Sequence, residues 1–174
     1  MKQNKDKEAL LTQDRVKDLF NYDSETGILT NRFKRSYNEL VGKEAGSMTA
    51  EGYRNVRINF ILYRVHRVIW LYVHGEWPTH QIDHINGIRD DNRLENLRVV
   101  THQENHKNQK RPRTNTSGIM GVCLVQGNYW KARIKVDGKD IHLYYGKDFF
   151  EACCARKYAE NKYGFHANHG RASA

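Results

Sequence analysis

The sequence predicts an α+β protein built from several small units rather than around one large sheet. Two observations predict this class. In the middle of the chain, two short segments of strand type are followed by a helix start signal, and in the last third a hairpin pattern precedes a longer run with helical spacing. The 174 residues contain no repeat or low-complexity tract. We therefore expect a succession of small α and β units.

The central unit begins with two short strands. Residues 81–85 alternate polar and apolar side chains, which is typical of a half-buried strand. Asn86 and Gly87 follow as turn residues because both tolerate positive φ. After a polar loop, residues 97–100 have the apolar, β-branched character of a second strand.

A helix should follow the second strand. Thr101 and Glu104 have the spacing of a capping box, which places the helix start near His102 and Asn105 in the first turn. We expect this helix to end at Pro112. Two strands and a helix can bring together side chains that are distant along the chain, here those of Asp83, His84 and Asn105.

These side chains have a defined chemistry. Asp83 is a carboxylate, His84 is a base at neutral pH, and Asn96 and Asn105 are amides. Together they are the inventory needed to activate a water molecule beside a divalent cation.

The central segment resembles the HNH nuclease family, in particular its phage-type and homing-endonuclease branch with the ββα-metal fold. The motif in this chain is DHINGIRDDNRLENLRVVTHQEN at residues 83–105, preceded by VHRVIW at 65–70 and GEWP at 75–78. The DH, NL and terminal N elements occur together at spacing similar to that of the family. The resemblance implies a metal-dependent nuclease core.

The resemblance also implies roles for individual residues. His84 would be the general base that takes a proton from the attacking water. Asp83 and Asn105 would hold one Mg²⁺ or Mn²⁺ ion per active site. Asn96 would hydrogen-bond across the loop and orient His84. Many members of the family end the motif with histidine, so His106, beside Asn105, is an alternative ligand.

Charge indicates the partner. Lysine and arginine total 29 against 20 acidic residues, a formal net charge of +9. Such an excess is typical of a protein that binds a polyanion, and double-stranded DNA is the expected partner. No apolar run approaches the length of a membrane-spanning helix, and the first residues lack the apolar core of a signal peptide. We therefore expect no membrane partner and a cytoplasmic location in the host cell of a phage or mobile element.

The three cysteines argue against other classes. They contain no CxxC pair, which makes a structural zinc site or a disulfide framework an unfavourable interpretation.

A basic, polar stretch at residues 107–118 predicts a flexible connection. It places a domain boundary after residue 112, and the expected domains are an N-terminal helix and small sheet at 1–60, a nuclease core at 61–112 and a further domain at 113–174. The connection is either a solvated linker or a phosphate contact through Lys110, Arg111 and Arg113.

The last domain has a hairpin pattern. Residues 130–136 alternate apolar and basic side chains, Asp137 and Gly138 turn the chain, and residues 141–145 alternate again. The run 149–163 has helical spacing and should cover the apolar face of the hairpin. The opposite face would then present five side chains to the major groove of DNA: Lys131, Arg133, Lys135, His142 and Tyr144.

This C-terminal part resembles an AP2-type DNA-binding domain, in which a three-stranded antiparallel sheet packs on one helix. The residues that carry the resemblance lie between 114 and 170 and are Ser117-Gly118, Gly121-Val122, Trp130-Lys131-Ala132-Arg133-Ile134, Tyr145-Gly146, Glu151-Ala152, Tyr158-Ala159, Gly164 and Ala167-Asn168. The family's arginines are missing from the first strand, where Met120, Cys123 and Val125 stand. Base recognition is therefore expected from the second and third strands.

The N-terminal third is the least informative. Thr12 is a suitable cap for a helix that carries Val16 and Leu19, and residues 54–59 suggest a small sheet. Arg54 and Arg57 on this sheet are expected to contact phosphates.

Three functional hypotheses follow from the sequence. The leading one is a site-directed, metal-dependent DNA endonuclease of the homing type that leaves 5′-phosphate and 3′-hydroxyl ends. The second is a non-catalytic DNA-binding regulator that keeps the nuclease unit as a scaffold, and the third is cleavage or binding of RNA. One active site per chain favours nicking by a monomer, whereas a homodimer could cut both strands.

Overall fold

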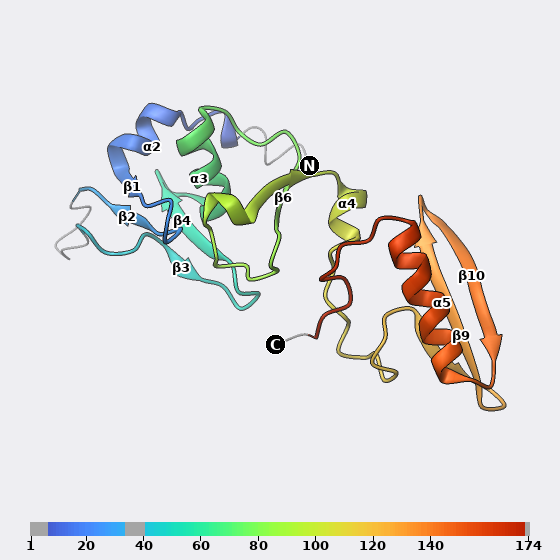
Figure 1. Cartoon of the computed structure of the whole chain (residues 1–174). Coiled ribbons are helices and arrows are strands. Elements are labelled where there is room, and N and C mark those ends of the chain that lie inside the picture. The colour runs from blue at the N-terminus through green and yellow to red at the C-terminus, as the bar shows by residue number, and fades with distance from the viewer. Residues whose placement is uncertain (1–6, 34–40, 173–174) are drawn as a thin grey trace. The chain divides into compact units, whose positions relative to one another are not determined.

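The computed structural model describes residues 7–33 and 41–172, and the chain divides into two compact units, Met1–Thr101 and His102–Ala174 (Figure 1). The first unit contains, in chain order, α2 (Gln13–Leu19), β1 (Phe20–Tyr22), β2 (Leu29–Asn31), β3 (Ser47–Met48), β4 (Arg54–Ile58), β5 (Ile61–Arg64), α3 (Val65–His74), β6 (Gln81–His84), the short 3₁₀ helix η1 (Leu94–Asn96) and β7 (Leu97–Val100). The second contains α4 (His102–His106), β8 (Val122–Val125), β9 (Tyr129–Val136), β10 (Lys139–Gly146) and α5 (Phe149–Lys162).

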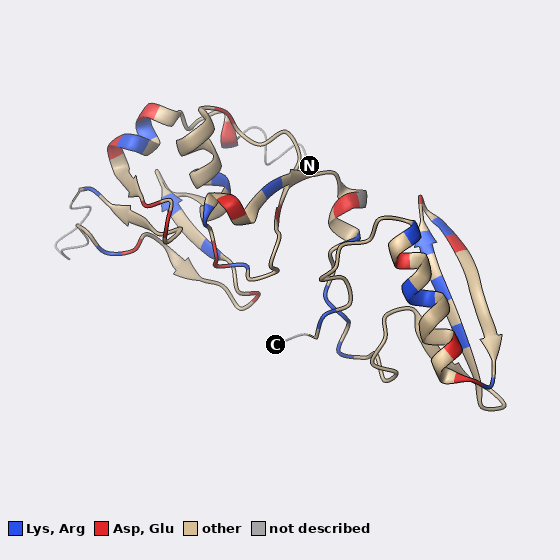
Figure 2. Ribbon diagram, viewed as in Figure 1, with Lys and Arg blue, Asp and Glu red and all other residues tan. Residues whose placement is uncertain are grey.

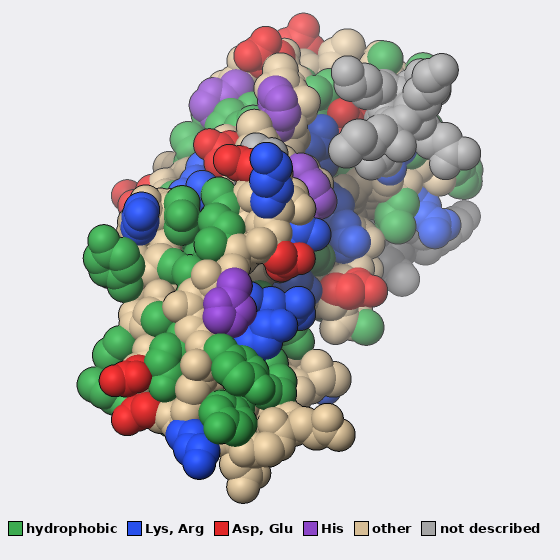
Figure 3. All heavy atoms as spheres, turned by 90° about the vertical axis from the view of Figure 1, so that its right-hand side faces the viewer, with side chains coloured by type: hydrophobic (Ala, Val, Ile, Leu, Met, Phe, Trp, Pro, Cys, Tyr) green, Lys and Arg blue, Asp and Glu red, His purple; other side chains and the backbone are tan. Residues whose placement is uncertain are grey.

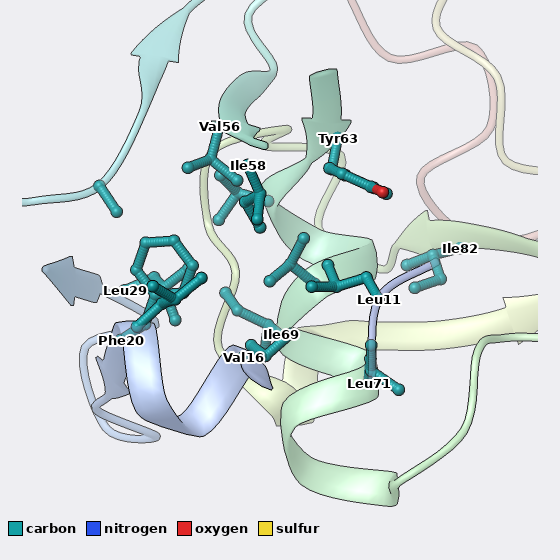
Figure 4. Close-up of a cluster of buried hydrophobic side chains, with 14 of the residues drawn as sticks. Leu11, Val16, Phe20, Leu29, Val56, Ile58, Tyr63, Ile69, Leu71 and Ile82 are labelled. Atoms are coloured by element: carbon teal, nitrogen blue, oxygen red, sulfur yellow. The ribbon is translucent and has the colours of Figure 1, made fainter. Parts of the chain in front are cut away.

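One hydrophobic core connects the elements of the first unit. Thr12 caps α2 as expected, because its hydroxyl accepts a hydrogen bond from the Arg15 amide. Figure 4 shows the core, to which α2, β4, α3 and β6 all contribute side chains. Val16, Val68 and Ile69 are completely removed from solvent. The N-terminal helix and small sheet therefore support the strand that carries Asp83 and His84.

The two central strands form as predicted. β6 and β7 pair antiparallel, with Asp83 opposite Arg98 and His84 opposite Leu97. The connecting loop starts with a tight turn at Gly87, whose amide donates to the His84 carbonyl and whose φ is 73°. Only a residue that tolerates left-handed backbone is suited to this position.

Helix α4 is shorter than expected. It ends at His106 and not at Pro112, and the next residues form backbone hydrogen bonds with the C-terminal segment. The Lys107 carbonyl accepts from His166, the Gln109 carbonyl accepts from Gly170, and the Arg111 amide donates to Arg171. The prediction of a flexible linker is therefore wrong for residues 107–111, because pairing that is remote in sequence orders them.

The second unit contains a three-stranded antiparallel sheet in the order β10-β9-β8, with α5 packed against β9 and β10. The turn at Asp137 and Gly138 is confirmed, with φ values of 50° and 79°. Val122, Ala132 and Ala152 form the centre of the buried cluster between sheet and helix. No helix in the described part of the chain is long and apolar enough to cross a membrane.

A bulge changes which tyrosine faces the core. The pairing of β10 with β9 shifts between His142 and Tyr144, so that Tyr144 lies opposite the buried Ala132. Tyr144 packs against the core, and its hydroxyl accepts from the Asp148 amide at 3.2 Å. The prediction that Tyr144 projects from the open face is wrong, because the extra residue in the bulge reverses the alternation. Tyr145 is exposed instead.

Candidate active site

His84 is the last residue of β6 and lies in an aromatic enclosure. The residue is 3% exposed. The ring of His66, from the first turn of α3, meets it edge-on with centroids 5.1 Å apart, and the Tyr53 ring lies at 6.0 Å. Burial lowers the pKa of His84, and it lowers the pKa of His66 to about 3. Both imidazoles are therefore neutral at pH 7.

Asn92 determines which nitrogen of His84 carries the proton. The Asn92 amide nitrogen donates to the Asp90 carbonyl, so its oxygen is the atom that faces His84 Nε2, at 3.2 Å. An amide oxygen only accepts hydrogen bonds, so Nε2 must donate. The lone pair of the neutral ring is then on Nδ1, which makes Nδ1 the basic atom.

Asn96 forms its side-chain hydrogen bonds within the loop. Its side-chain oxygen accepts from the Asn86 amide at 2.9 Å, and its nitrogen donates to the Asp91 carbonyl at 2.7 Å. The prediction of a hydrogen bond across the loop is confirmed, but the amide that faces His84 is Asn92. Asn96 therefore holds the loop, and the loop presents Asn92.

Asp91 strengthens the same loop. Its carboxylate accepts from Asn86 at 2.7 Å and from two nitrogens of Arg93 at 2.9 and 2.8 Å. These bonds, above all those from Arg93, lower the pKa of Asp91 to about 2. A carboxylate that remains ionised at neutral pH keeps the loop closed around Asn92.

Asp83 is buried beside Arg98, a cation that the sequence pattern does not predict as a site residue. The side chain of Asp83 is 9% exposed, and its Oδ2 accepts from Arg98 Nε at 3.0 Å and Nη2 at 2.8 Å. Arg98 is the cross-strand neighbour of Asp83 in the β6–β7 pair. A polar residue in the second strand, directly opposite Asp83, was the only signal in the sequence for this contact.

The proposed metal ligands belong to different units. Asp83 lies in the first unit, with His84 and Asn96, whereas Asn105 and His106 lie in α4 of the second. His106 Nε2 is 2.9 Å from His102 Nε2. No group of three or more His, Cys, Asp or Glu suited to a metal occurs among the described residues. A carboxylate and an amide oxygen do fit Mg²⁺, which is commonly held by one or two protein oxygens together with water and phosphate.

The two basic residues expected on β4 differ in how far they are exposed. Arg54 donates to both oxygens of Asp90, at 3.1 and 3.0 Å, and also pairs with Glu44 at 3.1 Å. Its side chain is 14% exposed, so the prediction that Arg54 is available to phosphate is wrong. Two carboxylates already neutralise its charge. Arg57 is exposed on the same strand.

The basic residues after α4 also differ in their exposure to solvent. Arg113 is exposed, whereas Lys110 and Arg111 are half-buried. Arg111 Nη1 donates to the Gly118 carbonyl, so this guanidinium has a structural contact within the second unit.

The open face of the C-terminal sheet is basic and aromatic. Arg133, Lys135 and His142 are exposed, and Lys131 is half-buried. Figure 2 shows the basic residues spaced along β9. Tyr145 stacks on Tyr129 with centroids 5.1 Å apart and rings within 4° of parallel. Hydrophobic and basic side chains both reach the surface of this unit (Figure 3).

The comparisons with known proteins identify the class and a relative. A family model described as HNH endonuclease matches residues 63–107, which therefore form an HNH endonuclease domain. The chain is also 33% identical over 90 residues to protein 3.8 of Escherichia phage T7, an alignment that covers 51% of this chain and 74% of the phage protein. The chain belongs to the family of that protein. No solved structure matches it.

Proposed function

We propose that the protein is a metal-dependent, site-directed DNA endonuclease of the homing type that hydrolyses one phosphodiester bond to 5′-phosphate and 3′-hydroxyl ends. The observation that carries this proposal is the neutral imidazole of His84, whose Nε2 faces the oxygen of Asn92 within an HNH domain. A neutral imidazole of defined tautomer, next in sequence to a carboxylate, is suited to general base catalysis.

In the proposed reaction, Nδ1 of His84 accepts a proton from the attacking water. Asn92 holds the ring in the tautomer that leaves Nδ1 basic. His66 and Tyr53 pack against the ring and limit its rotation. The enclosure therefore preorganises the base before substrate binds, which lowers the cost of reaching the transition state.

Asp83 and Asn105 would hold the divalent ion, Mg²⁺ or Mn²⁺, with His106 as the alternative to Asn105. The bound ion would neutralise charge that develops on the scissile phosphate and the departing oxygen. The guanidinium of Arg98 forms an ion pair with the Asp83 carboxylate and so neutralises its charge within the protein.

We further propose that the second unit is an AP2-like domain that grips the DNA. Its support is the three-stranded sheet on one helix and the basic face formed by Lys131, Arg133, Lys135 and His142. Each lysine or arginine contact to guanine would contribute about 1–3 kcal/mol of discrimination.

Plasmid nicking tests the proposal. The purified protein should convert supercoiled plasmid to open circles with Mg²⁺ or Mn²⁺ and not with a chelator. His84→Ala should bind duplex DNA normally but lose cleavage, while His80→Ala, which changes an exposed histidine of the same unit, should cleave normally. Retained cleavage in His84→Ala would remove His84 from the mechanism. DNA binding without metal-dependent cleavage in the unaltered protein would favour the non-catalytic regulator.

A further inference from the structure

Two arginines lie on the same aromatic ring beside His84. The guanidinium carbon of Arg64 is 4.6 Å from the centroid of Tyr53, and that of Arg89 is 4.8 Å from it. The same ring lies 6.0 Å from the ring of His84. Tyr53 thus contacts the proposed base and two cations that come from β5 and from the loop after β6.

These two arginines differ from the other arginines around the site in their charge partners. Arg54, Arg93 and Arg98 each form an ion pair with a carboxylate. Within the described part of the chain, Arg64 and Arg89 form no ion pair within 4.0 Å.

The hydrogen bonding of the two arginines leaves donors available. Arg64 Nη1 is buried and has no hydrogen-bond partner among the described residues. Arg89 donates through Nη1 to the Glu51 backbone carbonyl at 2.7 Å. The Glu51 carboxylate is fully exposed, and Arg64 and Arg89 are minor causes of its lowered pKa, after its hydrogen bonds. Arg64 and Arg89 thus place two positive charges on the ring of Tyr53, and Arg64 also has a buried donor without a hydrogen bond to any described residue. An anion bound here would stabilise both groups.

We infer that Arg64 and Arg89, held by Tyr53, bind phosphate groups of the DNA strand that His84 attacks. The inference rests on the proposed cleavage of DNA at His84. Guanidinium groups are well suited to phosphate because their planar donors can bond two oxygens at once. The ring of Tyr53 would keep both side chains extended, which reduces the conformational entropy lost on binding.

Salt-dependent binding tests the inference separately from catalysis. The probe is a fluorescent duplex of mixed sequence, titrated without divalent ions against the full chain with His84→Ala. Arg64→Ala and Arg89→Ala should each reduce the slope of log affinity against log salt by about 0.9, and the double variant by about twice that. Arg15→Ala, which removes an exposed arginine of α2, is the matched control and should leave the slope unchanged.

A second measurement tests the position of these contacts. The contacts of Arg64 and Arg89 to phosphate together form the proposed phosphate clamp. In the protein with His84 intact, the variant with both arginines changed to alanine should nick plasmid about tenfold more slowly even at saturating protein, because loss of the clamp misplaces the scissile bond. Arg64→Lys and Arg89→Lys should recover part of the salt slope, since a lysine keeps the charge. Because Arg64 is half-buried, Arg89→Ala decides the result if Arg64→Ala does not fold.

The outcomes separate the two proposals. An unchanged slope in folded variants of a protein that nicks plasmid would overturn the phosphate clamp and leave the nuclease intact. A reduced slope in a protein that never cleaves DNA would support the clamp as a DNA contact and reject the nuclease.

Discussion

Substitution of Asn92 tests the arrangement around His84 most directly. Asn92→Ala removes the acceptor that faces Nε2 of His84, and both residues are 3% exposed. A buried donor without a partner costs about 1–3 kcal/mol. Because about 1.4 kcal/mol corresponds to a tenfold change in rate, we expect nicking to slow by about 10- to 100-fold, provided that the cost falls on the active orientation of the ring.

The pH dependence of the nicking rate should shift in opposite directions in two variants of Asn92. The proposed base acts when neutral, so the rate should rise with pH through the pKa of His84. The hydrogen bond that His84 Nε2 donates to the Asn92 oxygen raises this pKa, against the larger effect of burial, which lowers it. Its loss in Asn92→Ala should therefore move the acidic limb of the rate profile to lower pH, whereas the carboxylate of Asn92→Asp should move it to higher pH.

The assay is single-turnover nicking of supercoiled plasmid across a pH series. Asn21→Ala, which removes an exposed amide on β1, is the control for a general effect of asparagine loss. Asn92→Ala protein that is folded and nicks at the unaltered rate would refute the assigned tautomer. Shifts of the acidic limb in the same direction for alanine and aspartate would refute the electrostatic reasoning.

Three further predictions concern stability and binding. Arg98→Ala removes the guanidinium that pairs with the Asp83 carboxylate, so the free energy of unfolding should fall by about 1–3 kcal/mol. Mn²⁺ should restore part of this loss in thermal melts. Equal loss with and without Mn²⁺ would count against a metal at Asp83. The pKa of His66 is about 3 in the folded protein, below its value of 6.5 in the unfolded chain. As pH falls, the unfolded state therefore binds a proton before the folded state does. The free energy of unfolding should fall as pH drops below 6.5, by up to about 1.4 kcal/mol per pH unit. His66→Phe should flatten this dependence in denaturant titrations, and an unchanged slope would reject His66 as its source. Tyr144→Ala should lower the melting temperature, whereas Tyr145→Ala should mainly weaken duplex binding; the reverse pattern would contradict the bulge.

Local signals predicted most elements that carry the site. The alternation at 81–85 and the β-branched run at 97–100 correspond to β6 and β7, and Asp137-Gly138 forms the turn between β9 and β10. These features depend on neighbouring residues, so the sequence contains them directly. The helix start at His102 is likewise encoded within a few residues.

Features that depend on distant partners were not predictable in this way. Asn92 and Asn96 are equivalent as amides in a polar loop, and only the closed loop determines which of them faces His84. Arg54 has the pattern of an exposed basic residue, but Asp90 and Glu44 approach it from elsewhere in the chain.

The sequence by itself determined the class of unit, an HNH segment, together with a basic chain and a hairpin followed by a helix, and it proposed Asp83, His84 and Asn105 for the chemistry. Only the tertiary structure decided which atoms are available for that chemistry. Burial makes His84 neutral, Asn92 assigns its proton, and the bulge exchanges Tyr144 for Tyr145 on the open face. The physical reason is that residue type and spacing specify periodicity and local turns, whereas solvation and hydrogen-bond partners depend on groups that meet only after folding.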